Sequence, residues 1–234
     1  MMRAGYQVTQ SQLVFELPHI PAFGSEDFFV SASNEQAVRL VEAWPDWPSP
    51  FAVIAGPEGA GKTHLANVWR ARSGAQSFDA FDVRTAVEQA REGAAGVVIE
   101  NIDHGAIDEH AAFHLLNLAR ESGFNVLITA RTQPGSWEIS LPDLRSRLRS
   151  AALVTIEEPD EALLSAVLVK LFADRQIGVE PGVIGYILKR MERSMAAASA
   201  VVDALDRAAL VERRRVTRAL AARLFAADEA GTAD

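Results

Sequence analysis

The chain of 234 residues contains no cysteine, which excludes disulfide bonds and metal sites built on thiolates. It has no apolar run near the roughly 18 residues that a membrane-spanning helix needs, and its first residues lack the pattern of a signal peptide. Positive charge is also scarce, because 23 lysines and arginines face 31 acidic residues and the formal net charge is −8. This balance argues against broad nucleic-acid binding as the main activity, while a local basic patch stays open. We therefore expect a soluble protein of a reducing cytoplasm with no membrane partner.

Apolar residues, in contrast, make up 49% of the chain, enough for a folded core in one large domain, or in a large and a small one. Up to about residue 158, short apolar runs typical of buried strands alternate with helical patterns. This alternation implies a parallel sheet covered by helices on both faces, with ligands at the carboxyl ends of the strands. From Pro159 onward only helical patterns remain. The predicted strands lie near 51–54, 78–83, 97–99, 125–129 and 153–156, and the predicted C-terminal helices near 160–174, 181–192, 195–211 and 217–227.

One glycine-rich stretch, residues 56–63, reads Gly-Pro-Glu-Gly-Ala-Gly-Lys-Thr and fits the phosphate-binding P-loop pattern G-x-x-x-x-G-K-[ST]. Its glycines let backbone N–H groups curl toward phosphate oxygens, and the helix that begins there adds the positive end of its dipole. Lys62 would supply a cation for the β- and γ-phosphates, and Thr63 a hydroxyl for Mg²⁺. A glycine-rich strand-to-helix turn without a ligand is the alternative. The residues expected to bind ATP or ADP here are Gly56, Gly59, Ala60, Gly61, Lys62, Thr63 and His64.

Two further polar residues end predicted strands. Glu100 follows the apolar run 97–99, as a Walker B acid must in order to reach Mg²⁺ beside a P-loop. Thr129 ends the next strand. Gly61, Glu100 and Thr129 therefore all lie at or just beyond carboxyl strand ends, which supports a nucleotide site there.

The N-terminal tail contains an extended apolar peptide, Gln12-Leu13-Val14-Phe15-Glu16-Leu17. Pro18 and Pro21 prevent this peptide from continuing as a helix. Such a peptide either packs on its own domain as an edge strand or docks in the groove of a partner, and the residues by themselves favour the first.

Together these motifs resemble an AAA+ ATPase. Residues 26–30 with Ser33-Asn34 resemble the segment before the P-loop in DnaA, the bacterial replication initiator; residues 127–134 resemble its sensor-1 segment, and residues 141–148 its arginine-finger box. The resemblance covers about residues 12–226. Because the chain ends where DnaA would continue into a basic helix-turn-helix domain, it is similar to the Hda family of short DnaA homologues.

The resemblance implies an α/β fold, an AAA+ P-loop ATPase with a five-stranded parallel sheet and a small C-terminal all-helical lid domain. The expected divisions are 1–24, a tail with a clamp-binding peptide; 25–158, the AAA+ nucleotide-binding domain; 159–227, the lid; and 228–234, a frayed tail.

Hda proteins carry an N-terminal peptide of the form Gln-Leu-x-hydrophobic-x-Leu that docks on the DNA polymerase sliding clamp. Gln12, Leu13, Phe15 and Leu17 fit this form, so the resemblance now favours docking over self-packing. The overlapping frame 10–15 fits the other clamp pattern, Gln-x-x-Leu-x-Phe, although the proline directly after Leu17 favours the first frame. The implied partners are the clamp and DnaA, with DNA reached through the clamp. The resemblance does not decide whether the protein forms homodimers or higher oligomers, or whether it contacts DNA directly.

The family also implies catalytic roles. Glu100 takes the place of the metal-binding acid, and Thr129 that of sensor 1. Asn101 stands where hydrolytic members carry the acid that orients the attacking water; because an amide cannot accept a proton, weak intrinsic ATPase activity is expected. Asp103 either substitutes in part for that acid or is a solvent-facing loop residue. Arg147, flanked by Arg145 and Arg149, matches the arginine that acts in trans on a neighbour's nucleotide.

The sensor-2 arginine of the family aligns with Ala196, and Arg193, one turn earlier on the same helix face, is the candidate replacement. This departure leaves ADP and ATP both open, and the resemblance favours ADP. The implied function is negative regulation of replication initiation by stimulating ATP hydrolysis on DnaA from the clamp. The alternatives are a helicase-loader-like or DNA-tethering adaptor and a stand-alone P-loop ATPase or kinase.

Overall fold

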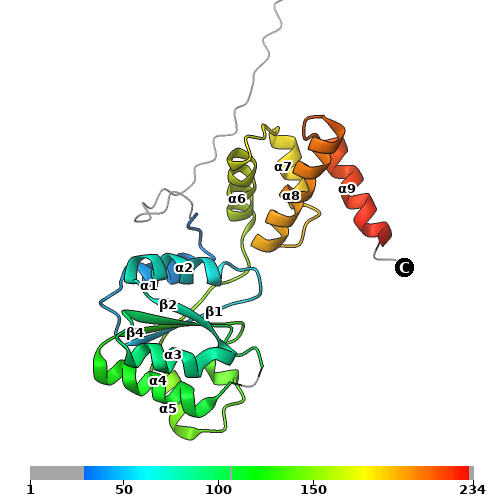
Figure 1. Cartoon of the computed structure of the whole chain (residues 1–234). Helices are drawn as coiled ribbons and strands as arrows, with labels where there is room; N and C mark the ends of the chain where they lie inside the picture. Colours follow the sequence, from blue (N-terminus) through cyan, green and yellow to red (C-terminus); the bar gives the residue numbers. More distant parts are fainter. Residues whose placement is uncertain (1–28, 106, 232–234) are drawn as a thin grey trace, which may run out of the picture.

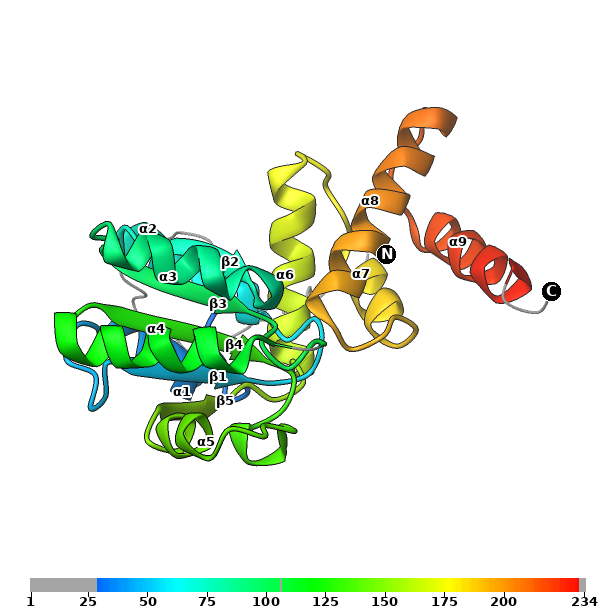
Figure 2. The same cartoon turned by 60° about the horizontal axis from the view of Figure 1, so that its bottom comes forward.

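The computed structural model describes residues 29–105 and 107–231. The predicted clamp peptide and the first residues of the segment before the P-loop lie outside these residues. Within them, an α/β domain is followed by a helical domain, the lid, whose helices stand at one end of the α/β domain (Figures 1 and 2). No helix of the described part is long and apolar enough to cross a membrane.

The α/β domain is built on one parallel sheet with the strand order β2-β3-β4-β1-β5. The central strands are buried on both faces, which explains why they appear in the sequence as continuous apolar runs. Because all strands run the same way, their carboxyl ends meet at one edge. The predicted α/β fold with five parallel strands is confirmed. The strands are β1 (Phe51–Ala55), β2 (Gln76–Asp79), β3 (Gly96–Glu100), β4 (Asn125–Ala130) and β5 (Ala152–Thr155).

Helices cover both faces of the sheet (Figure 1). α1 (Glu35–Glu42) and α2 (Lys62–Ser73) pack on one face, against side chains such as Ile54 and Leu127. α3 (Val83–Arg91), α4 (Glu109–Ser122) and α5 (Pro142–Arg149) pack on the other, against the alternate side chains of the same strands. This arrangement gives two separate apolar layers, one on each side of the sheet.

Three tryptophans fill the layer under α1 and α2. Trp47 stacks on Trp69 with ring centroids 5.3 Å apart, and Trp44 meets Trp69 edge-on at 6.2 Å. The Trp44 Nε1–H donates to Asn125 Oδ1 at 2.9 Å, and the Trp47 Nε1–H donates to the Leu40 carbonyl at 2.7 Å. The aromatic residues between α1 and the P-loop strand therefore have a packing role.

The lid has its own apolar core, formed by α6 (Glu161–Asp174), α7 (Pro181–Leu188), α8 (Met195–Glu212) and α9 (Arg218–Gly231). α7 ends four residues before the predicted boundary at 192. The chain turns there because Met191 folds back into the lid core and Ser194 caps the next helix.

The predicted strand over 78–83 is wrong after Asp79. β2 ends at Asp79, whose side chain accepts a hydrogen bond from the Phe81 N–H and caps the 3-10 turn Ala80–Asp82. Val83 begins α3. In this segment Ala80 and Val83 are buried whereas Phe81 is 67% exposed, so the apolar alternation does not mark one face of a strand.

Candidate functional site

The P-loop pattern lies between the end of β1 and the start of α2. Gly59 and Gly61 have φ angles of +73° and +99°, in the left-handed region that favours glycine. Gly61 is the N-cap of α2 and no side chain caps that helix, so its first N–H groups face the loop without a side-chain acceptor. A loop of this shape at a helix start is suited to bind phosphate.

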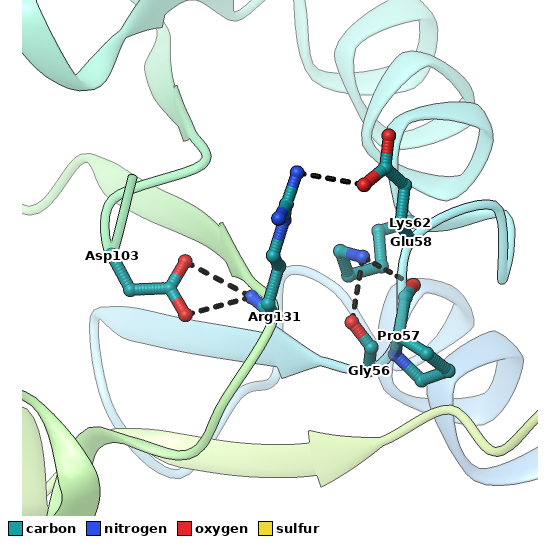
Figure 3. A network of polar contacts seen from close by, with 6 residues as sticks. All are labelled: Gly56, Pro57, Glu58, Lys62, Asp103 and Arg131. Atoms are coloured by element: carbon teal, nitrogen blue, oxygen red, sulfur yellow. Dashed lines mark hydrogen bonds and ion pairs between the residues drawn. The ribbon is translucent and has the colours of Figure 1, made fainter. Parts of the chain in front are cut away.

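Lys62 bends back over its own loop (Figure 3). Its side chain is buried, and its Nζ donates to the carbonyls of Gly56 and Pro57, each at 2.7 Å. Burial lowers the pKa of Lys62; the charges of Asp103 and Glu58 oppose this effect and that of Arg131 adds to it. A bound phosphate would have to replace these two carbonyls as the acceptor of the ammonium group.

The side chains of Thr63 and Glu100 are in contact. The Thr63 Oγ1–H donates to Glu100 Oε2 at 2.8 Å, and Ser77 in β2 donates to the other carboxylate oxygen at 2.9 Å. A hydroxyl and a carboxylate side by side are ligands that suit Mg²⁺. Ser77 is a site residue that sequence analysis missed, because only the pairing of β2 with β3 brings it beside Glu100.

Thr129 lies fully buried at the end of β4. Its Oγ1 accepts a hydrogen bond from the Asn101 N–H at 3.1 Å, and its carbonyl accepts one from the Ile102 N–H at 3.0 Å. Asn101 is left-handed, with φ of +53°. The Thr129 hydroxyl thus holds the backbone of Asn101 in place; a contact of this hydroxyl with a γ-phosphate stays a prediction.

Asp103 has a role that neither of the two expectations described. Its carboxylate accepts hydrogen bonds from the Arg131 N–H at 3.0 Å, the Thr132 N–H at 2.8 Å and the Thr132 hydroxyl at 2.9 Å. Burial raises the pKa of Asp103, but these hydrogen bonds outweigh burial and hold its pKa below the usual value. Asp103 therefore anchors the loop after β4 to the loop after β3.

Arg131, the first residue after β4, is a second site residue that sequence analysis missed. Its guanidinium lies 2.7 Å from Glu58 Oε2 in the P-loop (Figure 3). The ion pair joins the loop after β4 to the P-loop. The only sequence signal for it was a cation within the sensor-1 segment.

The lid touches the P-loop at the start of α8. The Met195 N–H donates to the Gly59 carbonyl at 2.9 Å, and a Cβ added at Gly59 would lie 2.7 Å from the Ser194 Cβ. The expectation that Arg193 lies one turn before Ala196 on one helix face is wrong, because α8 begins at Met195 and Ser194 is its N-cap. Arg193 lies in the preceding loop, 3.9 Å from the Glu161 carboxylate, and its side chain is 59% exposed.

Arg147 lies in α5, on the sheet face opposite α2. Its Nε–H donates to Asn117 Oδ1 in α4 at 3.1 Å, and its side chain is half-buried. Arg145 and Arg149 are both exposed, and Arg145 donates to the Ile139 carbonyl. The three arginines of the predicted box thus have different environments.

Comparison with known proteins agrees with this geometry. Residues 161–221 match the family described as Hda, lid domain. Domain III of the Thermotoga maritima replication initiation protein DnaA superposes with a TM-score of 0.75 at 17% identity, covering 90% of this chain and 98% of that one. AMPPCP-bound DnaA from Aquifex aeolicus gives 0.65 at 20% identity, covering 80% of this chain and 66% of that one. The RuvB Holliday junction branch migration motor of Thermotoga maritima gives 0.59 at 16% identity, covering 74% and 60%.

At these identities the solved structures establish the fold, and the family match covers residues of the lid alone. The lid of this chain is therefore similar to that of the Hda family, and the fold is similar to that of DnaA domain III, in agreement with the resemblance recognised in the sequence.

Proposed function

We propose that this protein is a nucleotide-dependent regulator of DnaA that acts from the DNA polymerase sliding clamp and limits replication initiation. The observation that carries the proposal is a lid of the Hda type seated directly on a P-loop, through the Met195 N–H and the Gly59 carbonyl. Nucleotide bound in such a loop would influence the position of the lid.

The proposed ligand is ATP or ADP with Mg²⁺. Lys62 would exchange its two loop carbonyls for phosphate oxygens, and the uncapped start of α2 would add backbone N–H donors. Thr63 and Glu100, already in contact, would hold Mg²⁺ directly or through water. The metal would supply positive charge against the phosphates.

Intrinsic hydrolysis is proposed to be slow. Asn101 offers an amide where a general base is needed, and an amide cannot take the proton of an attacking water. Asp103 does not substitute, because its carboxylate is occupied by three donors of the loop after β4. Bound nucleotide would therefore serve mainly to control the conformation of the protein and would be hydrolysed only slowly.

The catalytic contribution is proposed to be Arg147, acting on ATP bound to DnaA. Its position on the sheet face opposite α2 supports action on another molecule rather than on its own P-loop. Asn117 supports the side chain and pre-orients it, which lowers the entropic cost of docking. An arginine supplied in trans can accelerate phosphoryl transfer on the order of a thousandfold.

The test is DnaA ATPase activity in the presence of this protein and clamp-loaded DNA. The wild type is expected to accelerate hydrolysis, whereas Arg147→Ala should lose most of the acceleration and keep nucleotide and clamp binding. Arg149→Ala is the matched control, since Arg149 is exposed on the same helix two residues later. Normal stimulation by Arg147→Ala would show that the finger is assigned to the wrong residue.

A further inference from the structure

An apolar groove of about 680 Å³ lies between α6 and α7 of the lid. Its wall on α6 is the helix face that carries Ala162, Ser165, Val169 and Ala173, at steps of three or four residues. Most of these side chains are small. On α7, a Cβ added at Gly185 would meet no atom of the described residues within 4 Å. The two helices therefore leave an open space between them.

The groove offers apolar surface to a ligand. Val169 on its α6 wall is 52% exposed although it is apolar. The polar residues of the lining, Glu161 and Ser165, belong to the first turns of α6. Exposed apolar surface gathered in a groove is typical of a binding site. The larger apolar side chains that line the rest of it are Ile177, Val179, Ile184 and Leu188.

The first described residues of the chain lie at the foot of α6. The Glu157 N–H donates to the Ser33 carbonyl at 3.0 Å, and Glu157 precedes Glu161, the first residue of α6, by four positions. The Asn34 side chain donates to the Phe29 carbonyl at 3.0 Å and fixes the chain there. The segment before Phe29 is therefore attached beside the helix that forms one wall of the groove (Figure 1).

The clamp peptide, residues 12–17, is within reach of the groove. Leu17 precedes Phe29 by 12 residues, which span up to about 40 Å when extended. The 14 residues of α6 are only about 21 Å long. A flexible connection of this length gives the peptide an effective concentration on the order of millimolar at the groove. A partner without the connection has no such advantage.

The chemistry of the peptide suits the groove. In an extended conformation Leu13, Phe15 and Leu17 point to one side, because successive side chains alternate. An extended peptide with alternate apolar side chains fits a groove that has an apolar lining and a wall of small residues. These three residues are also the apolar anchors proposed for the clamp. One peptide therefore cannot occupy the groove and the clamp together.

We propose that the groove between α6 and α7 binds the chain's own clamp peptide through Leu13, Phe15 and Leu17, so that the lid withholds the peptide until the clamp competes for it. The effect on clamp binding rests on the proposed function, whereas occupation of the groove does not. The lid is then an autoinhibitory element for clamp docking.

Occupation is measured by NMR on the full chain, with a nitroxide attached at Glu16→Cys. The natural chain has no cysteine, so this thiol is unique. Paramagnetic broadening of methyl signals should be strong at Val169 and Ile184 and weak at Val211, an exposed valine at the end of α8. The paired substitutions Phe15→Asp and Leu17→Asp should abolish it. Absence of broadening in the groove, equal broadening at Val211, or broadening that survives both substitutions would overturn the inference.

A mixed sample tests whether the peptide comes from the same chain. The nitroxide is placed on one set of chains and the isotope label on another, and broadening at Ile184 should then be weak. Equal broadening in the mixed sample would assign the groove to the peptide of a second copy and would overturn autoinhibition within one chain.

Competition is measured as the dissociation constant for the clamp. Val169→Asp puts a charge on the exposed wall of the groove and should remove the broadening at Ile184. A groove that holds about four peptides in five lowers the clamp affinity about fivefold, so this variant should bind the clamp about fivefold more tightly. Val211→Asp is the matched control and should change neither quantity. An unchanged clamp affinity after loss of the broadening would overturn the competition.

The outcomes separate this inference from the proposed function. Gln12→Ala should lose clamp capture in the preferred frame and keep the broadening, because Gln12 is not an apolar anchor. If neither the wild type nor Val169→Asp binds the clamp, the proposed clamp docking fails, and the broadening at Ile184 still decides occupation of the groove. Thermal melting of each variant checks that the fold is intact.

Discussion

At the scale of single residues, the carboxylate of Asp103 shows how a loop acid can be structural inside a candidate site. It accepts hydrogen bonds from Arg131 and Thr132, and these lower its pKa against the opposing effect of burial. A group whose pKa is lower in the folded state stabilises the fold above its unfolded pKa. That contribution is lost as pH falls through the folded pKa.

Asp103→Asn should therefore lower the free energy of unfolding at pH 7 by about 1 kcal/mol, since an amide oxygen is a weaker acceptor than a carboxylate. The difference from the wild type should shrink as pH falls below the ordinary aspartate value of 3.8 and the wild-type carboxylate is protonated. Urea denaturation at pH 7 and near pH 3 measures both quantities. Glu121→Gln, an exposed carboxylate at the end of α4, is the control. A difference that stays constant over this range would contradict the assigned role of Asp103.

At the scale of elements, the helix that carries Arg147 is held at its first turn by a neighbouring helix. Glu109 at the start of α4 accepts hydrogen bonds from the Ser140 N–H and hydroxyl at 2.8 Å, and from the Leu141 N–H at 2.6 Å. Leu141 is the N-cap of α5 and offers no side-chain cap of its own. The hydrogen bonds from Ser140 and Leu141 lower the pKa of Glu109 although burial opposes them, so Glu109 binds as a carboxylate at neutral pH.

Glu109→Ala should reduce stimulation of DnaA hydrolysis several-fold, because a loosened start of α5 shifts Arg147 while leaving it in the chain. Nucleotide binding should be unchanged, since α4 and α5 cover the sheet face opposite α2. The ATPase assay with clamp-loaded DNA measures the first effect and nucleotide titration the second. Glu121→Ala, at the other end of α4, should have no effect. Full stimulation by Glu109→Ala would show that Glu109 does not position the finger.

At the scale of the whole molecule, the lid and the α/β domain meet at the P-loop. Gly59 has a positive φ and no room for a side chain against Ser194, so one residue serves both the loop conformation and the domain contact. A change in the conformation of the P-loop at Gly59 would therefore move the start of α8. The clamp peptide, which lies outside the described residues, is proposed to bring this assembly to DNA.

Substitutions in that peptide should separate clamp docking from nucleotide binding. Gln12→Ala and Leu13→Ala should abolish capture by the clamp in a pull-down, because each removes an anchor of an extended peptide in a groove. The two possible frames differ at Gln10, Gln12 and Leu17 and share Leu13 and Phe15. In the preferred frame Leu17→Ala loses binding and Gln10→Ala keeps it; the opposite result would assign the overlapping frame. Capture that survives both Gln12→Ala and Leu13→Ala would refute clamp docking by this peptide.

Local patterns in the sequence were sufficient for the larger features of the fold. Glycine spacing predicted the P-loop, the apolar run ending in Glu100 predicted its strand, and helical periodicity predicted the lid. Each of these features depends on neighbours within one short segment. Boundaries were less accurate where tertiary contacts set them, as at Asp79 and at the early end of α7.

By itself, the sequence determined the fold class, the P-loop pattern and the place of Glu100 at the carboxyl edge of the sheet, because parallel strands place their carboxyl ends at one edge. Only the tertiary structure decided that Asp103 anchors the loop after β4 and that Arg131 pairs with Glu58 over the P-loop. These contacts join segments far apart in the chain. Strand order and loop geometry determine which residues form these contacts, and a local sequence pattern does not contain that information.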